Sequence, residues 1–95
     1  MKQYEVMYIL KPSDKEGYYE NALKKYEDVI NHNNGKVEKT DKWGIKRLAY
    51  VINDCKDGYY VLSCFTGTPS TVNELDRVLR LDENVLRHMI ISKGE

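Results

Sequence analysis

The sequence is poor in the residues that usually build compact chemical sites. Its 95 residues include two cysteines, two histidines, two prolines and one tryptophan. A structural zinc site normally needs four Cys or His ligands in closely spaced pairs, and no such pair occurs here. Cys55 and Cys64 are therefore interpreted as free thiols in a reducing compartment. Neither a metal nor a cofactor is predicted.

Long apolar runs are also missing. Nothing approaches the ~18 consecutive apolar residues of a membrane span. Lys2 is followed by an alternating stretch instead of the apolar core of a signal peptide. We therefore expect a cytoplasmic protein with no membrane partner. A chain of this length is expected to form a single domain over residues 1–95, without the deep enclosed pocket that a small-molecule substrate needs.

Net charge is absent as well, because fifteen basic residues balance fifteen acidic ones. This argues against gripping nucleic acid by bulk charge, since such binding scales with the number of phosphates neutralised. The charge is nevertheless unevenly distributed. Residues 36–47 hold five basic and two acidic side chains, whereas residues 13–34 hold three basic and five acidic ones.

Hydrophobic periodicity predicts four strands and two helices. Residues 4–10 and 59–66 are apolar on both faces, which is typical of central strands. Gly44 is expected at a bulge or bend. The predicted elements in chain order are strand 4–10, helix 13–34, strand 36–52, strand 59–66, a helix from near Pro69 to the break at 82–84, and strand 85–91.

Local signals set the expected boundaries of these elements. Ser13-x-x-Glu16 reads as a capping box that starts the first helix, and Asn34-Gly35 as its end, with the glycine left-handed. The second helix has two possible starts, at Thr68-Pro69 and at Thr71-x-x-Glu74. Residues 53–58 are rich in turn formers and predict a hairpin loop.

The order β-α-β-β-α-β restricts the topology. Right-handed crossovers place both helices on the same face of the sheet. The predicted fold class is therefore α+β: a ferredoxin-like βαββαβ sandwich, with a four-stranded antiparallel sheet and two helices on one face. The first and third strands should be central, and the second and fourth should form the edges.

No cluster of catalytic groups is apparent, and no enzyme activity is predicted. Neither His32 nor His88 has a neighbouring nucleophile, and His88 is interpreted as a partly buried strand residue. There is no glycine-rich phosphate loop. Acylphosphatases share this element order, but their loop after strand one carries an arginine, where this chain has Lys11-Pro12-Ser13.

RNA-recognition motifs also share the order and stack bases on aromatic residues of strand three. Residues 58–61, Gly-Tyr-Tyr-Val, resemble the middle of their RNP1 pattern, but Asp57 puts the basic residue at the wrong register. Tyr59 and Tyr60 are therefore interpreted as sheet and core residues.

Residues 43–52 carry a more specific resemblance. Their sequence, Trp-Gly-Ile-Lys-Arg-Leu-Ala-Tyr-Val-Ile, resembles the signature of the family of the sixth protein of the bacterial small ribosomal subunit: a Gly, a basic pair, Leu-Ala-Tyr and a closing Ile. The likeness covers essentially the whole chain. Further matching positions are Tyr4-Glu5-Val6, Leu10, Pro12, Gly58-Tyr59-Tyr60, Glu74-Leu75-Asp76-Arg77, Leu79-Arg80-Leu81 and Asn84-Val85-Leu86-Arg87.

The resemblance implies a ribosome-associated structural protein that pairs with the eighteenth protein of the same subunit. Together the two would bind the central domain of the small-subunit (16S) rRNA. A net charge of zero is compatible with this role if a basic partner supplies much of the phosphate neutralisation.

Two groups of residues are hypothesised to carry these interactions. An edge strand with exposed amides is a natural site for a partner's backbone, and a basic, aromatic margin suits phosphate and sugar contacts. For Tyr4 core packing is an equal alternative, and Trp43 either anchors a partner or RNA or lies over the sheet edge. The hypothesised RNA-binding residues are Lys2, Tyr4, Arg87, His88 and Lys93, and the partner-binding residues are Trp43, Lys46, Arg47 and Tyr50.

Two other function classes remain open. One is a ferredoxin-like regulatory domain that senses a small ligand and dimerises through its sheet. The other is a small enzyme of the acylphosphatase type, whose activity would depend on Lys11. Ribosome co-sedimentation separates both from a ribosomal protein.

Overall fold

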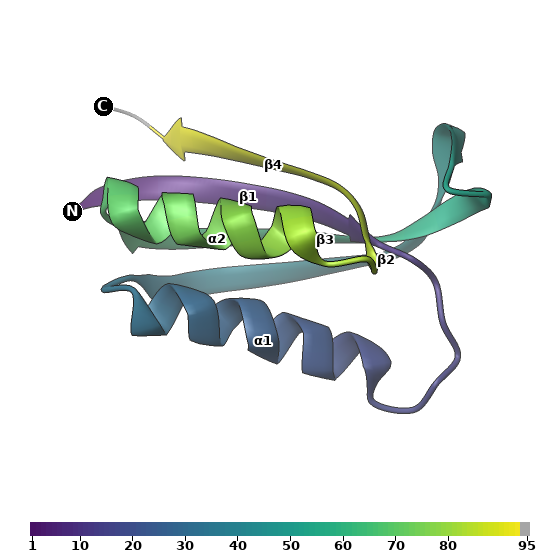
Figure 1. The fold of residues 1–95 in the computed structure, drawn as a ribbon, viewed down its shortest axis with the longest axis horizontal. Helices are drawn as coiled ribbons and strands as arrows, with labels where there is room; N and C mark the ends of the chain where they lie inside the picture. The colour runs from purple at the N-terminus through teal and green to yellow at the C-terminus, as the bar shows by residue number, and fades with distance from the viewer. Residues whose placement is uncertain (94–95) are drawn as a thin grey trace.

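The computed structural model describes residues 1–93, in which four strands and two helices form two layers (Figure 1). The sheet is antiparallel with the order β2-β3-β1-β4. Both helices cover one face, which confirms the predicted ferredoxin-like sandwich with β1 and β3 in the centre. The predicted domain range also includes residues 94 and 95, which lie outside the described residues. The elements are β1 (Lys2–Leu10), α1 (Tyr18–His32), β2 (Lys36–Ile52), β3 (Cys55–Gly67), α2 (Pro69–Leu81) and β4 (Val85–Lys93).

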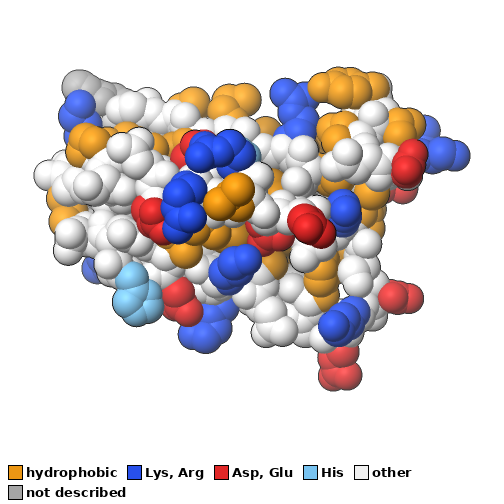
Figure 2. Space-filling model, viewed as in Figure 1, with side chains coloured by type: hydrophobic (Ala, Val, Ile, Leu, Met, Phe, Trp, Pro, Cys, Tyr) orange, Lys and Arg blue, Asp and Glu red, His pale blue; other side chains and the backbone are white. Residues whose placement is uncertain are grey.

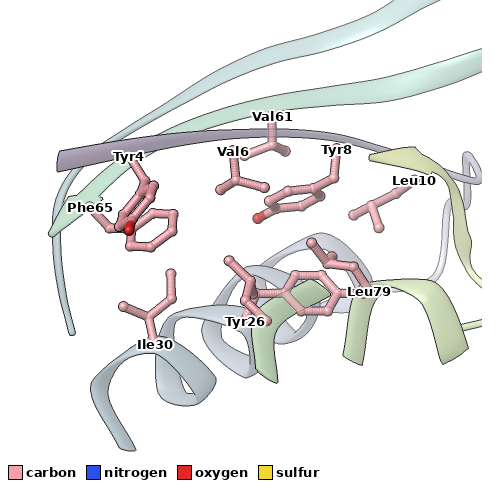
Figure 3. Packing of buried hydrophobic residues seen from close by; sticks show 10 residues of the cluster. Tyr4, Val6, Tyr8, Leu10, Tyr26, Ile30, Val61, Phe65 and Leu79 are labelled. Atoms are coloured by element: carbon pink, nitrogen blue, oxygen red, sulfur yellow. The ribbon is translucent and has the colours of Figure 1, made fainter. Parts of the chain in front are cut away.

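The main core lies between the sheet and the two helices (Figure 3). Alternate residues of β1 point toward the helices, because successive side chains of a strand face opposite ways. The rings of Tyr4 and Phe65 stack with centroids 5.5 Å apart, and Tyr8 meets Tyr26 edge-on at 5.0 Å. The buried members of this cluster are Tyr4, Val6, Tyr8, Leu10, Tyr26, Ile30, Val61, Phe65, Leu75 and Leu79.

The start of α1 differs from the prediction. The helix begins at Tyr18, and its N-cap is Gly17 with a left-handed φ of 78° and no side-chain cap. Ser13 shapes the preceding turn instead: its Oγ accepts from the Lys15 amide at 3.1 Å, and its own amide donates to the Tyr19 hydroxyl at 2.9 Å. The predicted capping box at Ser13 was therefore wrong, because local bonds within the turn occupy its polar groups.

The end of α1 lies where predicted, but its glycine has another role. Asn34 takes the left-handed conformation, with a φ of 66°, and the amide of Gly35 donates to the Ile30 carbonyl at 2.9 Å, as in a Schellman motif. A Cβ on Gly35 would lie 2.8 Å from side-chain atoms of Ile30 and Thr71. Close packing, and not a positive φ, therefore requires this glycine.

Of the two possible starts for α2, the structure has the earlier one. Thr68 is the N-cap, and its hydroxyl accepts from the Thr71 amide at 3.4 Å. The Thr71 hydroxyl accepts from the Thr68 amide at 3.1 Å and donates to the Asn33 carbonyl at 2.5 Å. Thr71 is fully buried, so this single hydroxyl ties the start of α2 to the end of α1.

The turn between β2 and β3 is shorter than expected, and the paired strands are correspondingly longer. Only Asn53 and Asp54 form its turn, both with positive φ (49° and 64°), as a type I′ turn requires. Residues 55–58 continue β3, so the predicted loop 53–58 was too long. The predicted bulge is confirmed at Gly44, where φ is 83° and the register shifts.

The far end of this hairpin, residues 45–58, is termed the hairpin tip. It extends beyond the ends of β1 and β4 (Figure 1). A second buried cluster of Ile9, Leu48 and Leu86 fastens the tip to both strands. A Cβ on Gly58 would lie 2.3 Å from the Ile9 side chain and 3.2 Å from that of Leu48. The tip can therefore pack here only because residue 58 has no side chain.

Candidate interaction surface

The face of the sheet away from the helices is termed the open face, and four rows of side chains cross its three strands β3, β1 and β4. Residues directly opposite in antiparallel strands lie on the same face, and Met7 alternates with the core residues of β1. The rows, each read across β3, β1 and β4, are Tyr60–Ile9–Arg87, Leu62–Met7–Met89, Cys64–Glu5–Ile91 and Thr66–Gln3–Lys93.

The middle of the open face is apolar and accessible. Met89 and Ile91 are 53% and 46% exposed, and Met7 and Leu62 are partly exposed. Contiguous exposed apolar patches commonly mark interaction sites. The sequence hypothesis missed these residues. The signal that points to them is that β1 is apolar on both faces while only one face receives helices.

At one end of the open face, Arg87 meets the hairpin tip. Its Nη1 donates to the Tyr50 hydroxyl at 2.6 Å, and its guanidinium carbon lies 5.9 Å from the centroid of the Tyr50 ring. The sequence hypothesis assigned Arg87 to RNA and Tyr50 to a protein partner. The structure joins these two residues, 37 positions apart in the chain, in one surface.

The other basic residues hypothesised to bind RNA lie elsewhere. Lys93 of β4 pairs with Gln3 of β1, whereas Arg87 pairs with Ile9. Lys93 and Arg87 are therefore about 20 Å apart along β4. Lys2 begins β1 beside the end of β4, on the left of Figure 1, with the hairpin tip on the right. Lys93 is also engaged with Glu5, at 3.9 Å. The hypothesised margin is therefore not one continuous cluster.

Tyr4 and His88 point toward the helices. Tyr4 is only 8% exposed and stacks on Phe65, so it packs in the core as its alternative interpretation describes. Its hypothesised contact with RNA stays a prediction. His88 is partly buried, and its Nε2 lies 2.8 Å from Oδ1 of Asp76 on α2. This hydrogen bond holds the pKa of the Asp76 carboxyl below its ordinary value. His88 thus links β4 to α2 and is not on the open face.

The hypothesised partner-binding residues all lie on β2 and are exposed. Trp43 is 48% exposed beside the Gly44 bulge, and Tyr50 is 59% exposed. Lys46 is also exposed, and Arg47 lies 3.7 Å from Asp57 across the hairpin. Within residues 1–93, β2 pairs with a strand on one side only. Its outer edge therefore offers free backbone groups next to these side chains.

The loop after β1 is not arranged to hold a phosphate. The Lys11 amide donates to the Asn84 carbonyl at 2.8 Å, and the Ser13 amide donates to the Tyr19 hydroxyl at 2.9 Å. Pro12 between them has no amide hydrogen. An anion cradle needs free backbone donors, and these three positions provide none.

A cavity of about 270 Å³ lies between α1 and the sheet. It is lined mainly by apolar side chains, together with the Tyr8 hydroxyl and a Thr40–Ser63 hydroxyl pair 3.1 Å apart. Burial raises the pKa of Tyr8 far above its ordinary value, so this hydroxyl stays neutral and is a poor base. Among the described residues, the ionisable side chains of the lining besides its tyrosines are Glu27 and Lys42.

The part of the chain that the structure describes shows neither a metal-binding cluster nor a membrane-spanning helix. Over residues 1–93, no three His, Cys, Asp or Glu side chains gather closely enough to hold a metal ion. Neither α1 nor α2 has the length and apolar character needed to cross a bilayer.

The chain is similar to known proteins over its whole length. A family model described as "Ribosomal protein S6" matches residues 3–92. "Small ribosomal subunit protein bS6" of Desulforamulus reducens is 45% identical, with both chains fully covered. The protein of the same name from Carboxydothermus hydrogenoformans is 41% identical over all of this chain and 99% of its own length. The crystal structure of 30S ribosomal protein S6 from Thermotoga maritima superposes with a TM-score of 0.90, at 25% identity, over 97% of this chain and 87% of that one.

Proposed function

The chain belongs to the ribosomal protein S6 family, and from this premise we propose that it helps build the small ribosomal subunit by binding 16S rRNA jointly with the eighteenth small-subunit protein. A structural role in the ribosome follows from the family itself, whose relatives carry the name of a small-subunit protein. Beyond this structural role, we propose the joint binding, the central domain of the rRNA as its target and the bacterial cytoplasm as its location.

The observation that carries the joint-binding proposal is the apolar open face on a protein without net charge. Met89 and Ile91 are about half exposed; Met89 continues the row through Met7 and Leu62, and Ile91 lies in the next row. Covering apolar surface of this kind with another protein is favourable, because it removes that surface from water. A neutral protein neutralises few phosphates alone, so a basic partner on this face would supply the missing charge.

The outer edge of β2 supports the same proposal. It presents unpaired backbone groups beside exposed Trp43, Lys46 and Arg47. A partner segment that adds to this edge would gain main-chain hydrogen bonds, and the neighbouring side chains would set its register. We place the partner on the apolar middle of the open face and on this edge, and propose no catalytic activity.

The test is filter binding of a central-domain fragment of 16S rRNA, with and without the eighteenth protein. We expect tight binding only when both proteins are present. Equally tight binding by this protein alone would contradict the joint-binding model. Ribosome co-sedimentation provides the independent check: a ligand-sensing regulatory domain or an acylphosphatase-type enzyme would not travel with the small subunit.

A further inference from the structure

The hairpin tip and β4 together form a local basic and aromatic surface on a molecule that is neutral overall. Lys46, Arg47 and Lys56 lie on the tip and Arg87 stands beside it, against two acidic residues, Asp54 and Asp57. Four exposed aromatic and apolar side chains are interleaved with these charges: Trp43, Ile45, Tyr50 and Val51. Figure 2 shows blue and orange side chains next to one another at this end of the molecule.

The Arg87 side chain is positioned by Tyr50 and keeps other donors accessible to a ligand. Its guanidinium has five N–H donors, and one of them is bonded to the Tyr50 hydroxyl at 2.6 Å. Over residues 1–93 it forms no ion pair, unlike Arg47, which lies 3.7 Å from Asp57. The remaining donors of Arg87 are therefore free to make paired hydrogen bonds to a phosphate.

The pair is also preorganised by the packing beneath it. Leu86, next to Arg87, and Leu48, two residues before Tyr50, are 9% and 5% exposed and pack together with Ile9. Because both backbones are fastened by the same cluster, the side chains lose less freedom when they engage a ligand.

Resting on the proposed rRNA-binding function, we propose that the hairpin tip is an RNA-contact surface in which Arg87 binds a backbone phosphate and Tyr50 is its positioning residue. The exposed Tyr50 ring is placed to stack on a base or ribose of an unpaired segment, the usual form in which proteins read RNA. Positive charge with accessible aromatic rings favours RNA here, whereas the apolar row of Leu62, Met7 and Met89 on the open face favours a protein.

The experiment measures binding of the central-domain RNA fragment across a salt series, with the eighteenth protein saturating. Arg87→Ala should weaken binding about tenfold and reduce the slope of log K against log salt by about one. Tyr50→Phe should weaken binding about threefold in the wild-type background, and have no further effect in the Arg87→Ala background, since its hydroxyl acts through Arg87. Arg87→Lys should restore the salt slope while remaining insensitive to Tyr50→Phe. Arg77→Ala, which removes an exposed charge from α2, is the matched control.

Each outcome decides between the proposals, once urea midpoints show that the variants fold. If the wild-type pair of proteins fails to bind the fragment, the proposed function itself is lost. Should the wild type bind and Arg87→Ala match it in affinity and salt slope, only the placement of the RNA on the hairpin tip is overturned. If the variants instead weaken the heterodimer measured without RNA, the tip is a protein interface and the inference is likewise rejected.

Discussion

At the scale of single residues, Asp82 shows how one side chain can join separate elements. It follows α2, and its carboxylate accepts from the Tyr26 hydroxyl at 2.5 Å, from Lys25 Nζ at 3.0 Å and from the Asn84 amide at 2.9 Å. Burial raises the pKa of Asp82, but the three hydrogen bonds outweigh it and hold the pKa below the ordinary value. Asp82 therefore binds α1 to the turn between α2 and β4 in its charged form.

Tyr26→Phe should destabilise the fold by about 1–3 kcal/mol at neutral pH, because a mostly buried carboxylate loses a hydrogen bond. The pKa of Asp82 is lower in the folded than in the unfolded chain, so its contribution is present above about pH 4 and is lost as the pH falls through the folded value. Urea denaturation from pH 7 to pH 2 should therefore show the gap between wild type and variant closing on acidification. Tyr50→Phe, at an exposed hydroxyl, is the control and should stay close to the wild type. A stability difference between wild type and Tyr26→Phe that does not change with pH would contradict the role assigned to the charged Asp82.

At the scale of elements, the hairpin tip depends on two glycines for different physical reasons. Gly58 has no room for a Cβ, because the Ile9 side chain would lie 2.3 Å away. Gly44 has open space around it but a φ of 83°. One glycine permits close packing, and the other permits the bulge.

We expect Gly58→Ala to destabilise the fold by about 1–3 kcal/mol through overpacking and to loosen the cluster of Ile9, Leu48 and Leu86. Gly44→Ala should cost about 1–2 kcal/mol through backbone strain alone, with the cluster intact. Urea denaturation gives the stabilities, and NMR contacts between the Leu48 and Leu86 methyl groups report on the cluster. Contacts that survive in Gly58→Ala as in Gly44→Ala would show that the tip is not held by this packing.

At the scale of the whole molecule, the two faces of the sheet differ because only one receives helices. The covered face holds the core, and the open face keeps Met89 and Ile91 accessible. The basic hairpin tip and the apolar middle adjoin, since Arg87 belongs to the row beside Met89. This adjacency fits a protein that brings a partner and RNA together.

Met89→Ser should weaken the heterodimer with the eighteenth protein about tenfold, if Met89 lies near the centre of the interface. Stability of the isolated protein should change by no more than about 0.5 kcal/mol, because the side chain is half exposed. Leu81→Ser is the matched control, since Leu81 is 65% exposed at the end of α2, away from the open face. Isothermal titration calorimetry measures the affinity of each variant for the eighteenth protein, and urea denaturation measures its stability. Equal affinities for the two variants would remove the partner from the open face.

The sequence by itself determined the order and type of the elements, the central position of β1 and β3 and the family. These depend on period and local order: alternation along residues 4–10, helical spacing, and the run from Trp43 to Ile52. Only the tertiary structure decided that Tyr4 is core, that His88 bonds to Asp76, and that Arg87 meets Tyr50. The reason is that each of these depends on strand register and on which face the helices cover. Register joins residues far apart in the chain, which no local pattern encodes.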